Sequence, residues 1–127
     1  MSIGHIAAIV SLAAVLLAPP HSFGGALEDG SAALEQKDYK KAFSLLLPVA
    51  KEGNSFAQYN IALMYAQGLG VEKNEEEAVK WYRKAAEQND PDAQTNLGLM
   101  YAQGRGIARD YQEAMKWYVK AAEKGMH

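Results

Sequence analysis

Apolar side chains recur at helical spacing through most of this chain, and one pattern of them occurs twice. Ala57, Ile61 and Tyr65 are four residues apart, and the same spacing returns 36 residues later. Aligning 57–91 with 93–127 gives 19 identities in 35 pairs without a gap. Spacings of three and four residues predict amphipathic helices, and a 36-residue period is typical of a stacked repeat array.

A second apolar stripe follows in each repeat and predicts a second helix. Its members are Ala78, Trp81 or Tyr82, Ala85 and Ala86 in one repeat, and Ala114, Trp117 or Tyr118, Ala121 and Ala122 in the other. Small residues let two helix axes approach closely, while a large aromatic side chain fills the space between neighbouring helix pairs. We therefore expect antiparallel helix pairs whose Trp-Tyr residues face the core.

Capping signals delimit these helices at matching places in both repeats. The N-cap candidates are Asn54 or Ser55, Asn74, Asp90 and Asp110, and the residues that end the first helices are Gly68 and Gly104. Glu77 and Glu113 lie three residues after their caps, which predicts a capping box with a return bond to the cap amide. Start and stop signals that agree with the apolar pattern support the helical prediction.

Residues 25–53 read as a degenerate first unit. Ala42 lies 36 residues before Ala78, so the second helix of this unit is in register with the later ones. Its apolar face is aliphatic, and Asp38 is the N-cap candidate. The expected fold is all-α, a solenoid of about three stacked antiparallel helix pairs at 25–53, 54–89 and 90–127, after an N-terminal signal helix.

The first 24 residues have a different composition. Residues 6–18 are apolar except for Ser11, a run too short for the roughly 20 residues that span a bilayer. Pro19-Pro20 and small residues follow, which is the layout of a secretory signal peptide at 1–24. No Lys or Arg precedes the apolar run. The alternative is an uncleaved hydrophobic segment that packs or anchors the chain.

Charge and cysteine content exclude several classes of function. The net charge is -2, and all charged residues lie after Gly25, which gives no electrostatic reason to bind nucleic acid or an anionic membrane. The chain has no cysteine, and hence no disulfide, thiol nucleophile or thiolate metal site. Its stability must come from apolar area buried between helices.

The repeated residues resemble a known family. The string Ala-Gln-x-Asn-x-x-Leu-Met-Tyr-Ala-Gln-Gly-x-Gly, followed by Glu-Ala-x-Lys-Trp-Tyr-x-Lys-Ala-Ala-Glu, is similar to the Sel-one-like repeat, a relative of the tetratricopeptide repeat. It covers 56–124, and Ala62 and Asn74 are mild departures from the pattern. The resemblance implies a right-handed α-solenoid that binds proteins or peptides, often exported in bacteria.

The candidate binding residues lie on the side of each first helix that is opposite its apolar stripe. They are Tyr59, Asn60, Leu63 and Gln67 in one repeat, and Thr95, Asn96, Leu99 and Gln103 in the next. In solenoids this side of the first helices lines the inner surface. Apolar groups beside amides suit peptide recognition. The alternative is that the leucines complete the packing within a repeat and the amides are solvated.

Signals for an enzyme are weak. The turns Gly68-Leu69-Gly70 and Gly104-Arg105-Gly106 follow helices and lack the Lys-Ser/Thr pair of a phosphate loop. Glu75, Glu76 and Glu77 fit helix capping and the helix dipole. Histidines occur only at 5, 21 and 127, which provides no base or metal cluster. We therefore expect no catalytic, cofactor or metal site.

The expected function is a non-enzymatic scaffold for proteins or peptides, exported to the periplasm or secreted. One alternative is a structural envelope factor that contacts cell-wall glycan. Another is a hydrolase that uses carboxylates alone, with Glu76 and Glu77 as the residues to test. The resemblance also includes cysteine-rich relatives linked to antibiotic hydrolysis, but this chain lacks their cysteines. A further expectation concerns the last helix, around Met115, Trp117 and Ala121. No polar closing helix follows it, which favours self-association at that end.

Overall fold

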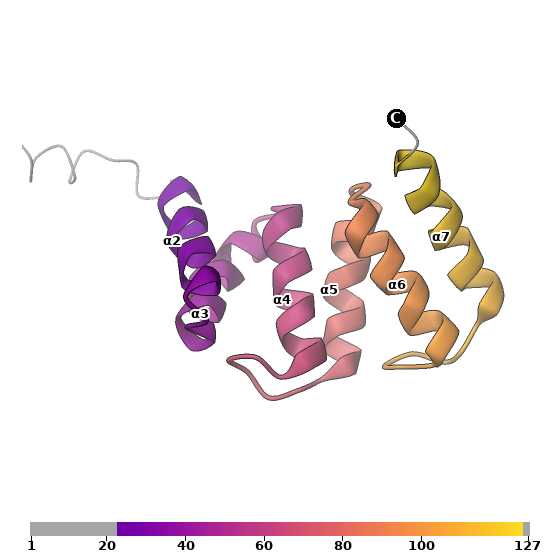
Figure 1. Ribbon diagram of the computed structural model, residues 1–127, viewed down its shortest axis with the longest axis horizontal. Helices are drawn as coiled ribbons and strands as arrows, with labels where there is room; N and C mark the ends of the chain where they lie inside the picture. Colours follow the sequence, from indigo (N-terminus) through magenta and orange to yellow (C-terminus); the bar gives the residue numbers. More distant parts are fainter. Residues whose placement is uncertain (1–22, 126–127) are drawn as a thin grey trace, which may run out of the picture.

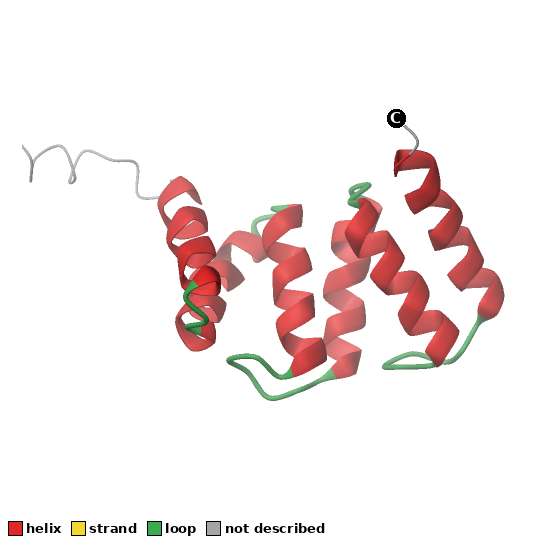
Figure 2. Cartoon of the chain, viewed as in Figure 1, coloured by secondary structure: helices red, strands yellow, loops and turns green. Residues whose placement is uncertain are grey.

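The structure, a computed structural model, describes residues 23–125. Its helices are α2 (Phe23–Glu35), α3 (Tyr39–Lys51), α4 (Ser55–Gln67), α5 (Glu75–Glu87), α6 (Pro91–Gln103) and α7 (Tyr111–Gly125). Within 23–125 only helices and loops are present (Figure 2). The expected all-α class is confirmed.

The helices form a row of three pairs, α2 with α3, α4 with α5, and α6 with α7 (Figure 1). Each pair also packs on the next, because α3 contacts α4 and α5 contacts α6. Helices that contact their sequence neighbours in this way make a solenoid, as the 36-residue period predicts. The proposed signal segment at 1–24 lies almost wholly outside the described residues, and so does the expected signal helix.

Capping residues start and end these helices where the sequence predicts them. The Asn54 side chain accepts a hydrogen bond from the Ala57 amide at 2.8 Å, and Gly68 ends α4 in the left-handed conformation with φ of 71°. Asp90 caps α6 in the same way, with Pro91 in its first turn. Local sequence chemistry therefore fixes the length of each helix.

The expected capping boxes form only in part. The Glu77 amide donates to the Asn74 side chain at 3.1 Å, but the Asn74 amide donates to the carbonyl of Tyr65 at 2.9 Å. The Asp110 amide likewise donates to the carbonyl of Tyr101. The predicted return bond from each glutamate is thus wrong, because the preceding helix of the pair already satisfies the cap amide.

The aromatic residues of the second helices lie in the core, as expected, although the two repeats use them differently. Tyr82 is 2% exposed in α5 and Trp117 is 9% exposed in α7, while Trp81 and Tyr118 are half-buried. Both pairs pack within or against the apolar clusters formed by successive helices. These clusters join each helix pair to its neighbour.

A buried glutamine joins successive units, which the apolar pattern does not reveal. Gln58 is 4% exposed, and its Nε2 donates to the carbonyl of Ala50 at the end of α3. Gln94 makes the equivalent bond to the carbonyl of Ala86. The Gln58 Oε1 also accepts from Gln88 Nε2 at 2.7 Å. Each buried amide therefore adds a second hydrogen bond to a carbonyl at the end of the preceding helix, which also accepts from a backbone amide.

The second glycine of each Gly-x-Gly turn lies against the backbone of the preceding unit. A Cβ on Gly106 would lie 2.3 Å from the carbonyl oxygen of Glu75, and one on Gly70 would lie equally close to that of Tyr39. Gly106 also has φ of 72°. These loops therefore require glycine both for the approach and for the backbone conformation.

Helix α2 is equivalent to α4 and α6, although its residues are not in register with the 36-residue sequence period. Gly30 of α2 lies beneath Leu46 of α3 as Gly98 of α6 lies beneath Tyr118 of α7. The loop at 36–38 is four residues shorter than the loop at 104–110, which shifts α2 by four residues against the period. Among the helices at 23–125, none is both long and apolar enough to cross a membrane.

Candidate functional site

A hollow of about 140 Å³ opens between α4 and α6, over the side of α5. We call it the α4/α6 groove. Its lining residues are Leu63, Ala66 and Gln67 of α4, Tyr82 of α5, Asn96, Leu99 and Met100 of α6, and Arg105 of the following loop. It therefore spans the junction of two successive repeats.

Four of the eight candidate binding residues line the α4/α6 groove: Leu63, Gln67, Asn96 and Leu99. Leu63 and Leu99 occupy equivalent places in their repeats, 36 residues apart. Leu99 is 39% exposed and Leu63 is half-buried, so neither is sealed within its own helix pair. The structure thus brings together one leucine and one amide from each repeat.

The other four candidates lie outside the groove lining. Asn60 is 8% exposed, and its Nδ2 donates to the carbonyl of Phe56 in its own helix, so it does not contribute to an open surface. Thr95 is exposed and donates to the carbonyl of Pro91. Tyr59 is half-buried against the ring of Tyr82, with centroids 5.8 Å apart. Gln103 is exposed and accepts from Arg105 Nη1 at 3.2 Å.

Sequence reasoning missed four lining residues, of which Tyr82 and Arg105 carry polar groups. Tyr82 was assigned to the core, which its burial confirms, but it also reaches the groove. Arg105 occupies the middle of a Gly-x-Gly turn, where the preceding repeat has Leu69. That difference between otherwise similar repeats is the signal that could have identified Arg105.

Arg105 brings a cation to the end of the groove. Its Nε lies 2.7 Å from Glu75 Oε2, and its side chain is 38% exposed. Since a guanidinium has five N–H donors in a planar fork, contacts to Glu75 and Gln103 fix its orientation without using every donor. The groove therefore has an apolar centre and a charged, hydrogen-bonding end.

The tyrosines beside the groove are held in the neutral state. Burial raises the pKa of Tyr82 to about 12, with a smaller contribution from Tyr59. Burial also raises the pKa of Tyr59, and a hydrogen bond to Asn96 opposes both shifts. Neutral phenols are hydrogen-bond donors and acceptors rather than nucleophiles at physiological pH. Both phenols therefore stay uncharged beside the groove at physiological pH.

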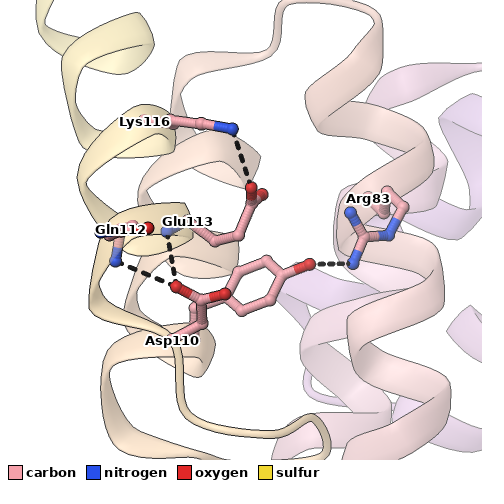
Figure 3. Close-up of polar contacts among 6 residues, drawn as sticks. Arg83, Asp110, Gln112, Glu113 and Lys116 are labelled. Atoms are coloured by element: carbon pink, nitrogen blue, oxygen red, sulfur yellow. Dashed lines mark hydrogen bonds and ion pairs between the residues drawn. The ribbon is translucent and has the colours of Figure 1, made fainter.

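A separate set of polar contacts holds the two repeats together away from the groove. Arg83 Nη2 of α5 donates to the Tyr101 hydroxyl of α6 at 2.6 Å (Figure 3). The guanidinium also lies 5.5 Å from the centroid of the Tyr101 ring. At the start of α7, Asp110 accepts from the Gln112 and Glu113 amides. The Arg83–Tyr101 bond therefore joins α5 to α6, whereas the Asp110 bonds cap the start of α7.

The size of the groove limits what it accepts. Small-molecule sites usually occupy about 300–1,000 Å³, so the 140 Å³ hollow is too small for a typical cofactor. A cavity of about 150 Å³ accommodates a group of the size of benzene. Residues 23–125 contain no cluster of His, Cys, Asp and Glu suited to a metal ion. The groove therefore matches one side chain of a larger ligand.

A model of the Sel1 repeat matches residues 12–54, 55–90 and 91–126. The chain belongs to the Sel1 repeat family. Its last two matches each contain one helix pair, α4 with α5 and α6 with α7. The α4/α6 groove thus lies between two consecutive Sel1 repeats. The first match begins within the apolar segment of the proposed signal peptide.

Solved structures of Sel1 repeat proteins share this fold. A Sel1 repeat protein from Oxalobacter formigenes is 47% identical with a TM-score of 0.72, over 76% of this chain and 40% of that one. A protective antigen of uropathogenic Escherichia coli strains with an SLR fold is 42% identical with a TM-score of 0.68, over 68% and 19%. Helicobacter pylori cysteine rich protein B, at 22% identity and a TM-score of 0.66 over 81% and 88%, shares the fold.

The similarity covers individual Sel1 repeats and not the whole length of most of these relatives. The chain spans less than half of the first two of these structures, and its matches to curated proteins cover 6% to 18% of their lengths. Sel1 repeat proteins typically act as protein-interaction modules and generally as non-catalytic scaffolds. Family membership therefore supports the class of function and leaves the partner to the chemistry of the site.

Proposed function

We propose that this protein is a non-enzymatic scaffold that binds a peptide segment of a partner protein in the α4/α6 groove. The observation that carries the proposal is the pairing of Leu63 with Leu99, from equivalent places in two repeats, around a hollow that fits one side chain. Amide groups of Gln67 and Asn96 line the same hollow. An apolar centre beside polar groups is typical of a peptide-binding site.

Each lining group has a definite role in this proposal. Leu63 and Leu99 contact one apolar side chain of the peptide, of about the size of leucine, methionine or phenylalanine. The amides of Gln67 and Asn96 both donate and accept, which matches the N–H and C=O groups of a peptide backbone. Arg105 favours an acidic residue or a terminal carboxylate next to the apolar anchor.

We propose further that the protein acts in the cell envelope or secreted space. The support is the composition of residues 1–24, an uncharged apolar run followed by prolines and small residues. The test is to purify the protein from its own cells and measure the mass of its N-terminus. A chain that starts near Gly25 supports export, and Val15→Arg should keep the protein inside the cell at full length. A full-length N-terminus would contradict cleavage.

The binding test uses a displayed library of random seven-residue peptides, selected on the purified protein. We expect the selected peptides to share one apolar residue beside an acidic residue or a free carboxyl terminus. Leu63→Asp with Leu99→Asp should weaken binding of these peptides at least 100-fold, because a carboxylate in the groove is poorly solvated and repels the acidic group. Helical circular dichroism and the melting temperature should remain unchanged.

The matched control is Tyr111→Asp, at an apolar residue that is 64% exposed and outside the groove lining. It should bind the peptides as the wild type does. Loss of both binding and stability in the leucine variant would mean that the leucines are core residues. Binding of cell-wall glycan fragments that the leucine variant abolishes, with no peptide selected, would favour the glycan alternative.

A further inference from the structure

The side of α4 and α6 that lines the α4/α6 groove continues towards the start of both helices. Phe56 and Asp92 occupy equivalent places, 36 residues apart, and each lies seven residues before Leu63 or Leu99. Seven residues make almost two helical turns, so Phe56 and Asp92 lie on the same side of their helices as these leucines. Both helices begin at the same edge of the row (Figure 1). The two residues therefore flank the approach to the groove.

Phe56 and Asp92 together suit a basic side chain. Phe56 is 47% exposed. Asp92 is also exposed, and none of the ion pairs within 23–125 involves it. An acid in the first turn favours the helix dipole, but α4 begins with no acid in its first turn, so the helix start does not require one. An aromatic ring beside a carboxylate attracts Lys or Arg. We call Phe56 and Asp92 the acidic end.

The opposite end of the groove carries a net positive charge. Arg105 Nε lies 2.7 Å from Glu75 Oε2, and Lys73 Nζ lies 4.0 Å from the same oxygen. Two cations therefore share one carboxylate, which leaves one positive charge in excess. We call Lys73, Glu75 and Arg105 the basic end. A carboxylate of a ligand is attracted there, and the guanidinium has further N–H donors to offer it.

Two tyrosines between these ends respond to both charges. The Tyr59 ring centroid lies 5.8 Å from that of Tyr82, which lines the groove. Burial raises the pKa of Tyr59 most, and the Asp92 carboxylate raises it further. Burial also raises the pKa of Tyr82, whereas the Arg105 guanidinium lowers it. The acidic end and the basic end therefore act with opposite sign along one continuous surface.

The spacing of these features favours the free C-terminus of a peptide. Neighbouring side chains of an extended peptide point to opposite faces, so an acidic residue next to the apolar anchor would point away from the groove. A C-terminal residue instead carries its side chain and its carboxylate together. Residues two apart point to the same face and lie about 7 Å apart. Asp92 lies about 10 Å from Leu99 along α6, and the four-carbon stem of a lysine spans the difference.

We propose that the α4/α6 groove binds the free C-terminus of a partner protein that has an apolar last residue and a basic residue two places before it. This inference rests on the proposed peptide-binding function and names the class of peptide. The last side chain lies between Leu63 and Leu99, its carboxylate meets the basic end, and the basic side chain meets the acidic end. The peptide thus runs in the same direction as α6. A peptide with the opposite charges is repelled at both ends.

The test measures binding of N-terminally labelled peptides by fluorescence anisotropy. The reference peptide is Gly-Ser-Gly-Lys-Ser-Leu with a free carboxyl terminus. One comparison peptide ends in a carboxamide, and another has Glu in place of Lys. We expect each comparison peptide to bind about 10-fold more weakly, because each loses one of the two charge contacts. The protein is the same in all three measurements, so a change in its folding cannot explain a difference.

A charge-reversed variant tests the acidic end directly. Asp92→Lys should reverse the preference, so that the Glu peptide binds more tightly than the Lys peptide, which a merely structural role of Asp92 would not cause. The matched control is Asp29→Lys, at an exposed acid of α2, which should keep the wild-type preference.

A reference peptide that does not bind, equal binding of all three peptides, or a preference that Asp92→Lys leaves unchanged would overturn this inference. The proposed function would still stand if peptides selected from the random library lose binding in the variant with Leu63→Asp and Leu99→Asp. If no selected peptide depends on these leucines, both proposals fail.

Discussion

The close approach of Gly106 to the preceding unit makes a quantitative prediction about stability. Replacing Gly106 by Ala places a Cβ 2.3 Å from the Glu75 carbonyl oxygen, at a residue whose φ is 72°. The left-handed conformation costs a non-glycine residue about 1–2 kcal/mol. Moving two packed backbones apart adds about 1–3 kcal/mol. We therefore expect Gly106→Ala to lower the free energy of unfolding by about 3 kcal/mol.

Two other glycines separate these contributions. Gly53 has φ of 110° but no heavy atom within 4 Å of an added Cβ, so Gly53→Ala should cost about 1–2 kcal/mol from the backbone alone. Gly125 has neither a positive φ nor a neighbour within 4 Å. Gly125→Ala should therefore change the free energy of unfolding by less than about 0.5 kcal/mol.

Urea unfolding followed by circular dichroism measures all three variants. For a folded unit of about 100 residues, a loss of about 3 kcal/mol also lowers the melting temperature by roughly 12 °C or more. The order of cost should be Gly106, then Gly53, then Gly125. A Gly106→Ala variant as stable as Gly53→Ala would refute the reasoning, because it would mean that the loop moves away from α5 at no cost.

Three further predictions concern buried polar groups. Tyr101→Phe removes the hydroxyl that accepts from Arg83 and should lower the free energy of unfolding by about 1.5 kcal/mol, measured by urea unfolding. The equivalent change Tyr65→Phe should cost less, because Leu47 stands one unit earlier in the place of Arg83. Gln58→Ala should cost about 1 kcal/mol, because it removes the side-chain bonds to the Ala50 carbonyl and to Gln88 while the Ala50 carbonyl keeps its bond from the Gly53 amide. Full stability of this variant would contradict a role for Gln58 in joining the two units. Because the pKa of Tyr82 is about 12 in the folded protein and about 10 in the unfolded chain, its contribution to stability should stay constant below pH 10 and fall by up to about 3 kcal/mol towards pH 12. Tyr82→Phe should make this loss of stability smaller. A pH profile that is the same in the variant and the wild type would contradict the role of Tyr82.

The α4/α6 groove was only half predictable, because the helix pattern locates a side of a helix but not its neighbours. Spacing alone assigned Leu63 and Leu99 to the side of their helices that lines this hollow. Asn60 was assigned there too, yet the structure buries it with a bond to its own helix. Arg105 was missed because a loop has no periodicity, and its place beside Glu75 depends on the packing of two repeats.

The sequence by itself determined the helices, their caps and their pairing, since each depends on residues close together in the chain. The 36-residue period also predicted stacking, because one helix pair is too thin to bury its own apolar side. Tertiary structure alone decided that Gly106 meets the Glu75 backbone, that Gln58 spans two units, and that α2 is shifted by four residues. These features depend on distances between separate helix pairs, which local spacing does not encode.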